Sequence, residues 1–267
     1  MRLLSRRTVR WVAWTFCVLV VLFGLYLSVL FFPYPLFPHH VEAAGFSVYS
    51  DHEISESFKL ILDDAQRRVE AMPLYRAEAM PRIFVCCSQR RFEFFVKLAG
   101  KRHAGQGLLV SMAGNAFFSE QGIEAVAHRN QTRPANSRLE GSWSAAIAHE
   151  VAHHLVFTEV GLRGTRRIPV WKSEGYADYT ANITKLGLDP GSKILDRIRL
   201  LIDENSRQGP TGEIDRRHFR WQVMVEFLCE VKGLDLPGLL AMNVTESDTW
   251  TELLAWQRRN HRPMEIH

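Results

Sequence analysis

The chain has 267 residues, of which 46% are hydrophobic and 23% charged, a composition typical of one sizeable globular domain or two small lobes. Its formal charge of +4 belongs to the N-terminus, where Arg2, Arg6, Arg7 and Arg10 stand in a stretch, residues 1–32, that contains no acidic residue. The remaining 29 basic residues balance 29 acidic ones, so the charge does not indicate a nucleic-acid-binding surface.

Residues 11–32 predict a transmembrane helix, because these 22 residues carry no charge and span roughly 33 Å against a hydrocarbon core of about 30 Å. Trp11, Trp14 and Tyr34 lie near its ends, where interfacial aromatic residues are common. The basic tail 1–10 is expected in the cytoplasm and the remainder outside it, in the periplasm if the source is bacterial. A cleaved signal peptide is the alternative, but "FFPYPLFPHH" offers no small-x-small cleavage site, which favours a retained signal anchor.

Beyond the span, the sequence predicts a linker and then a small α+β lobe. Three prolines make residues 33–45 a stiff linker, and residues 46–141 form the lobe. The expected elements are a strand at 46–50, a helix at 53–71, a strand at 82–88, a helix at 89–100 and two short strands within 107–120. Gly114-Asn115 marks the turn between those two strands, and residues 121–141 are expected to be a loop.

Residues 142–267 predict a helical lobe. The candidate helices are 143–160, 170–185, 191–206, 215–232, 235–242 and 248–259. Gly161 and Gly164 are expected to end the first of them, and Pro169 suits the start of the second.

The chain has four cysteines, and Cys17 lies in the apolar span. An exported domain would permit a disulfide between Cys229 and either Cys86 or Cys87. We favour the alternative that these residues are small buried hydrophobes, and their spacing does not form a cysteine zinc cage.

The stretch "AIAHEVAHHLVF", residues 147–158, contains the pattern HExxH. His149 and His153 are four residues apart, so a helix places both imidazoles on one face, close enough to share one zinc ion. Glu150 can reach a water on that ion and act as general base. His154 points away from the ion. A core helix with satisfied histidines is the alternative, but burying these groups without a metal would be costly.

A third ligand is expected in "VWKSEGYADYTA", which follows after a basic turn. A second helix packed antiparallel to the first would bring Glu174 over the two histidines. Asp178 lies on the same face, where it could accept the outer N–H of a ligand histidine and fix its tautomer. Without the preceding HExxH, Glu174 and Asp178 would be interpreted as a solvated acidic face.

Residues 142–182 resemble the gluzincin metallopeptidases, the group of thermolysin and the zinc aminopeptidases. Their second helix commonly reads W-x-x-E-G-x-A-x-Y, which Trp171, Glu174, Gly175, Ala177 and Tyr179 match. The resemblance implies an α+β, zincin-like catalytic domain with one zinc ion and a peptide or protein substrate. It also implies a substrate-binding edge strand at 113–119. The G-x-M-E-N motif of the aminopeptidases is absent, with "AGNAFFS" in its place, which favours an endopeptidase.

The same family places a tyrosine or histidine further along the chain to stabilise the oxyanion of the reaction. His218, in "HFRWQVMVEFLCEVKG", aligns best with that position. Tyr176, Tyr179 and Trp221 are competitors, and an ordinary surface histidine is a further alternative.

These residues together predict a membrane-anchored, extracytoplasmic zinc peptidase in which zinc-activated water attacks the peptide bond. Two alternatives remain open. One is a non-catalytic module that zinc stabilises, and the other is a zinc hydrolase acting on a substrate that is not a peptide.

Overall fold

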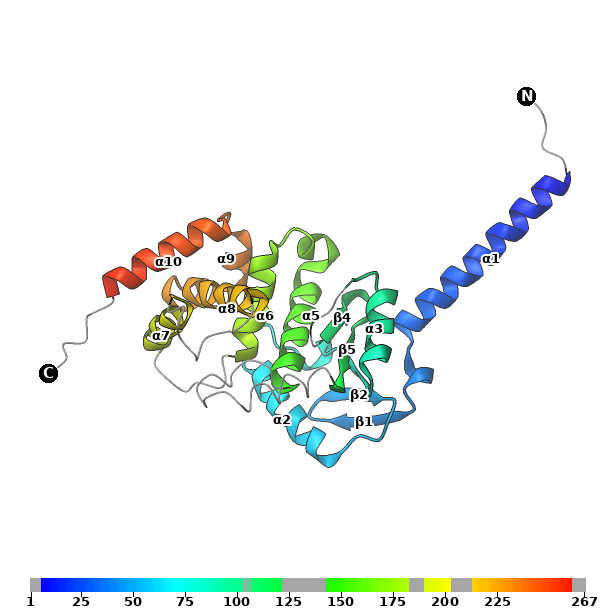
Figure 1. The fold of residues 1–267 in the computed structure, drawn as a ribbon, viewed down its shortest axis with the longest axis horizontal. Coiled ribbons are helices and arrows are strands. Elements are labelled where there is room, and N and C mark those ends of the chain that lie inside the picture. Colours follow the sequence, from blue (N-terminus) through cyan, green and yellow to red (C-terminus); the bar gives the residue numbers. More distant parts are fainter. Residues whose placement is uncertain are drawn as a thin grey trace, which may run out of the picture.

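The computed structural model describes residues 6–102, 105, 107–121, 143–182, 190–202 and 213–260. A long N-terminal helix leads into a lobe with a five-stranded sheet, and a lobe of helices follows (Figure 1). The α+β class predicted from the sequence is therefore confirmed. The loop expected at 121–141 lies, except for Gln121, outside the described residues.

Helix α1, Arg6–Phe31, projects away from the body of the molecule (Figure 1). Its section Arg10–Phe31 is mostly exposed, and it is long and apolar enough to cross a membrane. Length and composition fit a signal anchor and a signal sequence equally well.

The sheet has the strand order β1-β2-β3-β5-β4. Its strands are β1 His39–Ala43, β2 Phe46–Ser50, β3 Arg82–Cys86, β4 Gly107–Val110 and β5 Asn115–Ser119. Strands β2, β3 and β5 are parallel, whereas β1 and β4 run antiparallel to their neighbours at the two edges.

The expected position of the edge strand was wrong, because β5 lies inside the sheet between β3 and β4. All five residues of β5 are buried, which suits a central strand covered on both faces. The chain reverses through the short 3-10 turn Ser111–Ala113, and Gly114 adopts the left-handed conformation with φ 62°. The first strand of this pair, Gly107–Val110, is therefore the edge.

The expected linker 33–45 also needs correction, since its residues 39–43 form strand β1. Ala44 and Gly45 both have positive φ, 51° and 74°, as the two-residue turn of a tight hairpin requires. The side chains of β1 are exposed or half-buried, and its sequence HHVEA contains no run of apolar residues that would predict a strand.

The alternation of side chains along the strands creates two hydrophobic layers. Phe46, Val48, Ile83 and Phe118 face the layer that contains helix α2, Glu56–Glu70, and helix α5. On the opposite face lie Phe84, Phe117 and the apolar side of helix α3, Gln89–Leu98.

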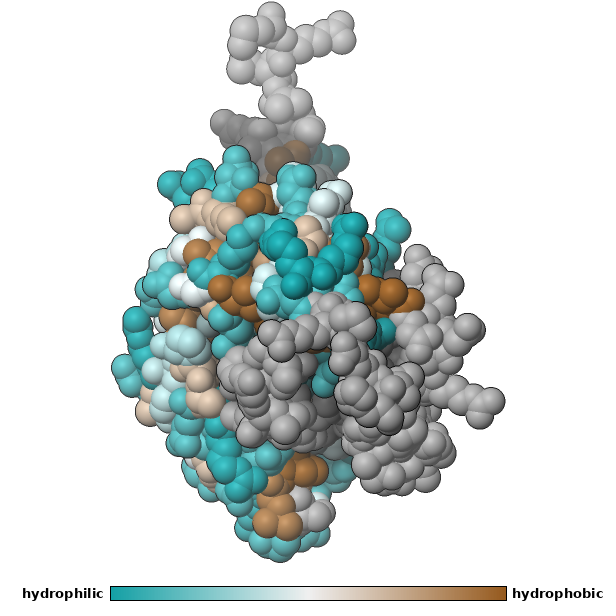
Figure 2. All heavy atoms as spheres, turned by 90° about the vertical axis from the view of Figure 1, so that its left-hand side faces the viewer, coloured by the Kyte–Doolittle hydropathy of each residue, from teal (hydrophilic) through white to brown (hydrophobic). Residues whose placement is uncertain are grey.

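The helices expected after residue 142 are present in the described segments. They are α5 Trp143–Thr165, α6 Val170–Asn182, α7 Pro190–Ile202, α8 Glu213–Glu226, α9 Leu236–Ala241 and α10 Glu246–Asn260, with a π-helical turn at Phe227–Val231. Gly161 is not helical, with φ 68° and ψ −179°, so the first helical segment of α5 ends there as expected, and after this kink a second short segment continues to Thr165. At the end of the molecule that carries α7, α9 and α10, hydrophilic and hydrophobic residues are interspersed (Figure 2).

Candidate metal centre

The candidate site lies where α5 and α6 pack against each other, beside edge strand β4. The apolar residues of α5, including Ile147, Val151 and Leu155, are buried against the sheet and α2. This burial fixes the rotation of α5 and leaves His149, Glu150 and His153 half-buried along a cleft.

Helix α8 comes unusually close to α6 because Gly175 has no side chain. A Cβ at this position would lie 2.5 Å from the backbone oxygen of Trp221, nearer than two such atoms can approach. Glycine at position 175 therefore permits the close contact between α6 and α8. The close contact brings α8, and with it His218, to the side of the site.

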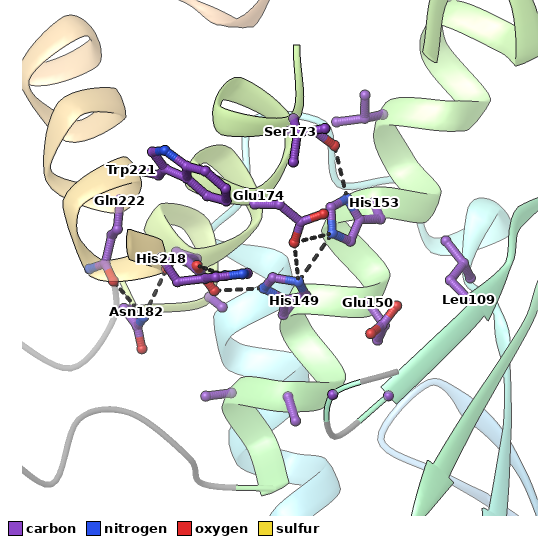
Figure 3. A pocket seen from close by; sticks show the side chains of 18 of the residues that line it. Leu109, His149, Glu150, His153, Ser173, Glu174, Asn182, His218, Trp221 and Gln222 are labelled. Carbon is purple, nitrogen blue, oxygen red and sulfur yellow. Dashed lines mark hydrogen bonds and ion pairs between the residues drawn. The ribbon is translucent and has the colours of Figure 1, made fainter. Parts of the chain in front are cut away.

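Three potential metal ligands converge in the space between α5 and α6 (Figure 3). The Nε2 atoms of His149 and His153 are 3.1 Å apart, and Glu174 Oε2 lies 3.4 Å and 3.5 Å from them. A tetrahedral ion bound at about 2.0–2.1 Å separates its ligand atoms by about 3.3 Å. The three donors already have the spacing that one such ion needs, so the site fits a bound metal.

Asp178 fixes the tautomer of His149. Its Oδ1 is 2.7 Å from His149 Nδ1, and a carboxylate can only accept, so Nδ1 carries the hydrogen and Nε2 is left to bind an ion. The second carboxylate oxygen of Asp178 is 3.2 Å from His218 Nδ1. One half-buried carboxylate therefore orients two imidazoles from different helices.

The charges around the site favour a cation. Burial of His149 opposes its charged form, but Asp178 and Glu174 outweigh burial and raise the pKa of His149 well above its ordinary value. Burial likewise opposes ionisation of Glu174, yet the two histidines lower its pKa below its ordinary range. The same carboxylates that would attract a proton here would attract a metal ion.

Glu150 lies on the other side of His149 from His218, with its carboxylate on the side of strand β4, which carries Leu109 (Figure 3). A Cβ at Gly107, the first residue of β4, would lie 2.7 Å from both Cγ and Oε1 of Glu150. Glycine at this position therefore makes the room that the Glu150 side chain occupies. The sequence pattern did not reveal this contact, since the two residues are 43 positions apart.

The site opens into a cleft of about 740 Å³. Gly107 and Leu109 of β4 line one part of it, and Arg217, His218 and Trp221 of α8 line another. Hydrogen bonding to Asp178 raises the pKa of His218 above its ordinary value. A half-buried imidazole that can donate from Nε2 thus lines the cleft.

The other candidates lie in different surroundings. The side chains of Tyr176 and Tyr179 are buried in the core of the helical lobe, and Tyr179 donates a hydrogen bond to Glu230. His154 lies against Gly114 and near Arg82, so it faces the sheet, as expected for a residue pointing away from the ligand histidines. Ser173, which the motif did not single out, contacts His153 Nδ1 at 3.3 Å.

A second group with metal-ligand chemistry lies at the carboxyl ends of the parallel strands: Asp51, His52 and Cys87. Arg91 forms an ion pair with Asp51 at 3.1 Å, and His52 contacts Ser50 and Asp51 through Nδ1 and Glu120 through Nε2. Its residues thus form ion pairs and hydrogen bonds with neighbours outside the group, namely Arg91, Ser50 and Glu120.

All four cysteines are free, so the disulfide considered from the sequence is not formed. Cys86 is buried as a small hydrophobe, and burial raises the pKa of the half-buried Cys229 to about 12. Cys87 is exposed, which the favoured interpretation did not anticipate.

No model of a known protein family matches the chain, and no curated protein matches it significantly. The functional argument therefore depends on the geometry of the site.

Proposed function

We propose that this protein is a zinc-dependent peptidase that acts outside the cytoplasm, as an endopeptidase. The observation that carries the proposal is the triangle of His149 Nε2, His153 Nε2 and Glu174 Oε2, with sides of 3.1–3.5 Å, beside an open cleft that also contains Glu150. Two histidines and one glutamate are the ligand set of catalytic zinc sites of the thermolysin type. The similarity of residues 142–182 to gluzincin motifs supports the same assignment.

Zinc bound here would supply Lewis acidity, lowering the pKa of a water molecule and polarising the substrate carbonyl. Glu150 would accept a proton from the attacking water and deliver it to the leaving amine. Its position on the cleft side of α5, held beside Gly107, suits that role. Asp178 would keep the ring of His149 oriented through the hydrogen bond to Nδ1.

His218 is the proposed donor to the oxyanion that forms during peptide hydrolysis. Its Nδ1 contacts Asp178, so the ring can present Nε2–H to the cleft. The raised pKa of His218 supports a donating, positively charged ring. Trp221 also lines the cleft, but its side chain is nearly buried.

The position of strand β4 is evidence for a polypeptide substrate. It is the edge of the sheet, and Gly107, Leu109 and Ser111 line the cleft next to it. An extended peptide could add to this edge through backbone hydrogen bonds. The absence of the aminopeptidase motif favours cleavage within a chain over removal of its first residue.

We also propose that α1 is a retained signal anchor with its N-terminus in the cytoplasm. Leu30, at its C-terminal end, is only 5% exposed and belongs to the packed body of the molecule. The buried side chain of Asn115 donates to the backbone oxygens of Leu30 and Phe31. Cleavage near this point would remove part of the folded domain, whereas a signal sequence is normally dispensable.

The test compares Glu150→Gln with Glu159→Gln, the same change on an exposed part of the same helix. Both variants should retain one zinc ion per chain in metal analysis. Only Glu150→Gln should lose cleavage of a peptide library followed by mass spectrometry, by roughly 10²-fold or more. Cleavage at the wild-type rate by Glu150→Gln would show that the general-base assignment is wrong.

The alternative is a non-catalytic module in which zinc holds α5 and α6 together. Structural zinc sites are usually closed by four protein ligands. The described residues bring three donors together next to an open cleft, which favours catalysis. Wild-type protein that binds one zinc ion but cleaves no peptide in the library would support the alternative.

A further inference from the structure

The C-terminal end of α1 is joined to the body by specific contacts. The hydroxyl of Tyr26 donates to the backbone oxygen of Leu98, the last residue of α3, at 2.7 Å. Asn115, fully buried on β5, donates to the oxygen of Leu30 at 2.7 Å. These contacts fix the direction of α1 relative to α3, which lies beside the base of α1 (Figure 1).

The contact between Tyr26 and Leu98 fixes the position of the end of α3 along the axis of α1, and so its depth relative to the membrane that α1 is proposed to cross. Tyr26 precedes the end of α1 by five residues, which corresponds to about 7.5 Å along the axis. The polar interfacial layer on one side of a bilayer is about 5–7.5 Å thick. The part of α1 from Arg10 to Tyr26 spans about 24 Å, and the long side chain of Arg10 can reach the remaining distance to the far interface of the hydrocarbon core.

The outward face of α3 has the composition of a membrane-contacting surface. Arg90, Phe94 and Lys97 follow one another at helical spacing and are all exposed, and Phe94 is a large apolar residue that is 50% exposed. The basic residues Lys101 and Arg102 follow two residues after the end of the helix, beyond Ala99 and Gly100, and are also exposed. Glu93 is the acidic residue on the same face, so the net charge of this surface is positive.

We propose that this basic face, formed by Arg90, Phe94, Lys97, Lys101 and Arg102, binds the anionic phospholipid headgroups of the bilayer that α1 crosses. The inference rests on the proposed retention of α1 as an anchor. The depth set by Tyr26 brings the basic side chains to headgroup level, where anionic lipids attract lysine and arginine. Phe94 is then placed where an exposed aromatic ring is favourable.

The basic face also sets the position of the cleft. Lys101 lines the cleft, and Gly105 and Gly107, which follow in the chain, line it as well. The part of the cleft lined by Lys101 therefore lies beside the proposed membrane surface. If the proposed peptidase activity is correct, its substrates are polypeptide segments close to that surface, either membrane-attached or just emerging from the bilayer.

The first experiment measures lipid contact in the full chain, reconstituted in lipid nanodiscs. The exposed Cys17 and Cys87 are replaced by serine, and a fluorescent label is attached at Phe94→Cys or, as control, at Thr251→Cys. Thr251 is exposed on α10, at the end of the molecule away from α1 (Figure 1). Lipids carrying a nitroxide near the headgroup should quench the label at position 94 and leave the label at 251 unaffected. Equal, weak quenching at both positions would overturn the proposal.

Charge reversal tests the role of the headgroups. The double variant Lys97→Glu/Arg102→Glu should lose most of the quenching at position 94 when the nanodiscs contain phosphatidylglycerol. Arg258→Glu/Arg259→Glu, a matched reversal of exposed residues on α10, should not. Quenching that is the same in pure phosphatidylcholine and insensitive to Lys97→Glu/Arg102→Glu would show that anionic headgroups are not recognised.

The substrate class is tested separately, with one peptide supplied either free or attached to a lipid in the same nanodisc. The wild-type chain should cleave the attached form many-fold faster, and Lys97→Glu/Arg102→Glu should reduce that preference. Equal cleavage of the two forms would contradict the inference about substrates. If the label shows lipid contact but neither form of the peptide is cleaved, the peptidase proposal is overturned. The proposal that the basic face binds lipid headgroups would still hold.

Discussion

Asp178 contacts two histidines with different proposed roles, the candidate metal ligand His149 and the proposed oxyanion donor His218. Its two carboxylate oxygens reach His149 at 2.7 Å and His218 at 3.2 Å. Although burial opposes its ionisation, the two histidines lower the pKa of Asp178 below its ordinary value. A single carboxylate that remains charged thus stabilises groups on α5 and α8.

Asp178→Asn should weaken metal binding by about 10–100-fold, the usual effect of removing a carboxylate that orients a ligand histidine. The neutral amide can still accept a hydrogen bond, but it no longer favours the oriented, electron-rich imidazole of His149. Competition with a chromophoric chelator measures the affinity directly, without reference to catalysis.

The matched control is Asp196→Asn on α7, where the exposed aspartate forms an ion pair with Arg199 at the surface. That change should leave the metal affinity as it is. Circular dichroism of both variants establishes whether the fold is intact, and a correctly folded Asp178→Asn with wild-type affinity would refute the role given to Asp178.

Gly107 shows how a residue without a side chain can belong to the site. A methyl group there would overlap the carboxylate of Glu150. Glycine in a strand often marks a position that another group approaches closely, so the residue type at 107 is consistent with the contact that the structure shows. The sequence alone does not say which side chain approaches it.

At the scale of elements, helix α2 joins the two helices that carry the candidate ligands. Asp64 of α2 accepts hydrogen bonds from Ser144, at the start of α5, and from Arg68. The fully buried Arg68 donates in turn to the backbone oxygen of Ala181 near the end of α6. This chain of contacts holds α5 and α6 in their relative positions.

The pH dependence of stability should report on this connection. Burial alone would raise the pKa of Asp64, but the hydrogen bonds from Ser144 and Arg68 outweigh it and lower the pKa below its ordinary value. The folded state therefore binds fewer protons than the unfolded state. The stabilisation is fully present above the ordinary aspartate pKa of about 3.9 and is lost as the pH falls toward the lower pKa of the folded state.

Asp64→Asn should reduce the free energy of unfolding at neutral pH by about 2 kcal/mol, because Arg68 loses its charged partner. The difference from wild type should shrink as the pH falls below about 4, because Asp64 then takes up a proton first in the unfolded chain and, at still lower pH, in the folded chain. Denaturant unfolding of the metal-free chains at a series of pH values measures the loss of unfolding free energy and its dependence on pH. Asp63→Asn, on the same helix, is the control, and a difference that does not change with pH would contradict the linkage.

The sequence predicted the site better than it predicted the sheet. His149, Glu150 and His153 lie within one helix, and Glu174 and Asp178 within the next, so helical periodicity alone places them on common faces. The contact between Asp178 and His218 of α8 depends on segments that are distant in the sequence, and so does the order of the strands. Helical periodicity therefore does not predict either of them. The two hairpin strands were expected, but whether the first or the second lies at the edge depends on which one pairs with β3.

At the scale of the whole molecule, the segment between α1 and the sheet belongs to the folded core. Phe37 is 2% exposed and packs against Phe84, Phe95 and Phe117, with ring centroids 5.1 Å, 5.6 Å and 6.3 Å away. Strand β1 begins two residues later. Helix α1, the proposed anchor, is thus continuous with the hydrophobic layer beneath α3, which gives the cleft a fixed orientation relative to α1.

This continuity predicts that Phe37→Ala destabilises the globular domain itself, by about 3–5 kcal/mol, the usual cost of removing a buried aromatic side chain. Phe32→Ala is the matched control, because Phe32 is 64% exposed and its loss should change the free energy of unfolding by less than about 0.5 kcal/mol. Both are measured on the full chain in detergent, by denaturant unfolding followed through near-ultraviolet circular dichroism. Equal stability of the two variants would mean that residues 33–38 act only as a tether, and the orientation of the cleft would then not be set by α1.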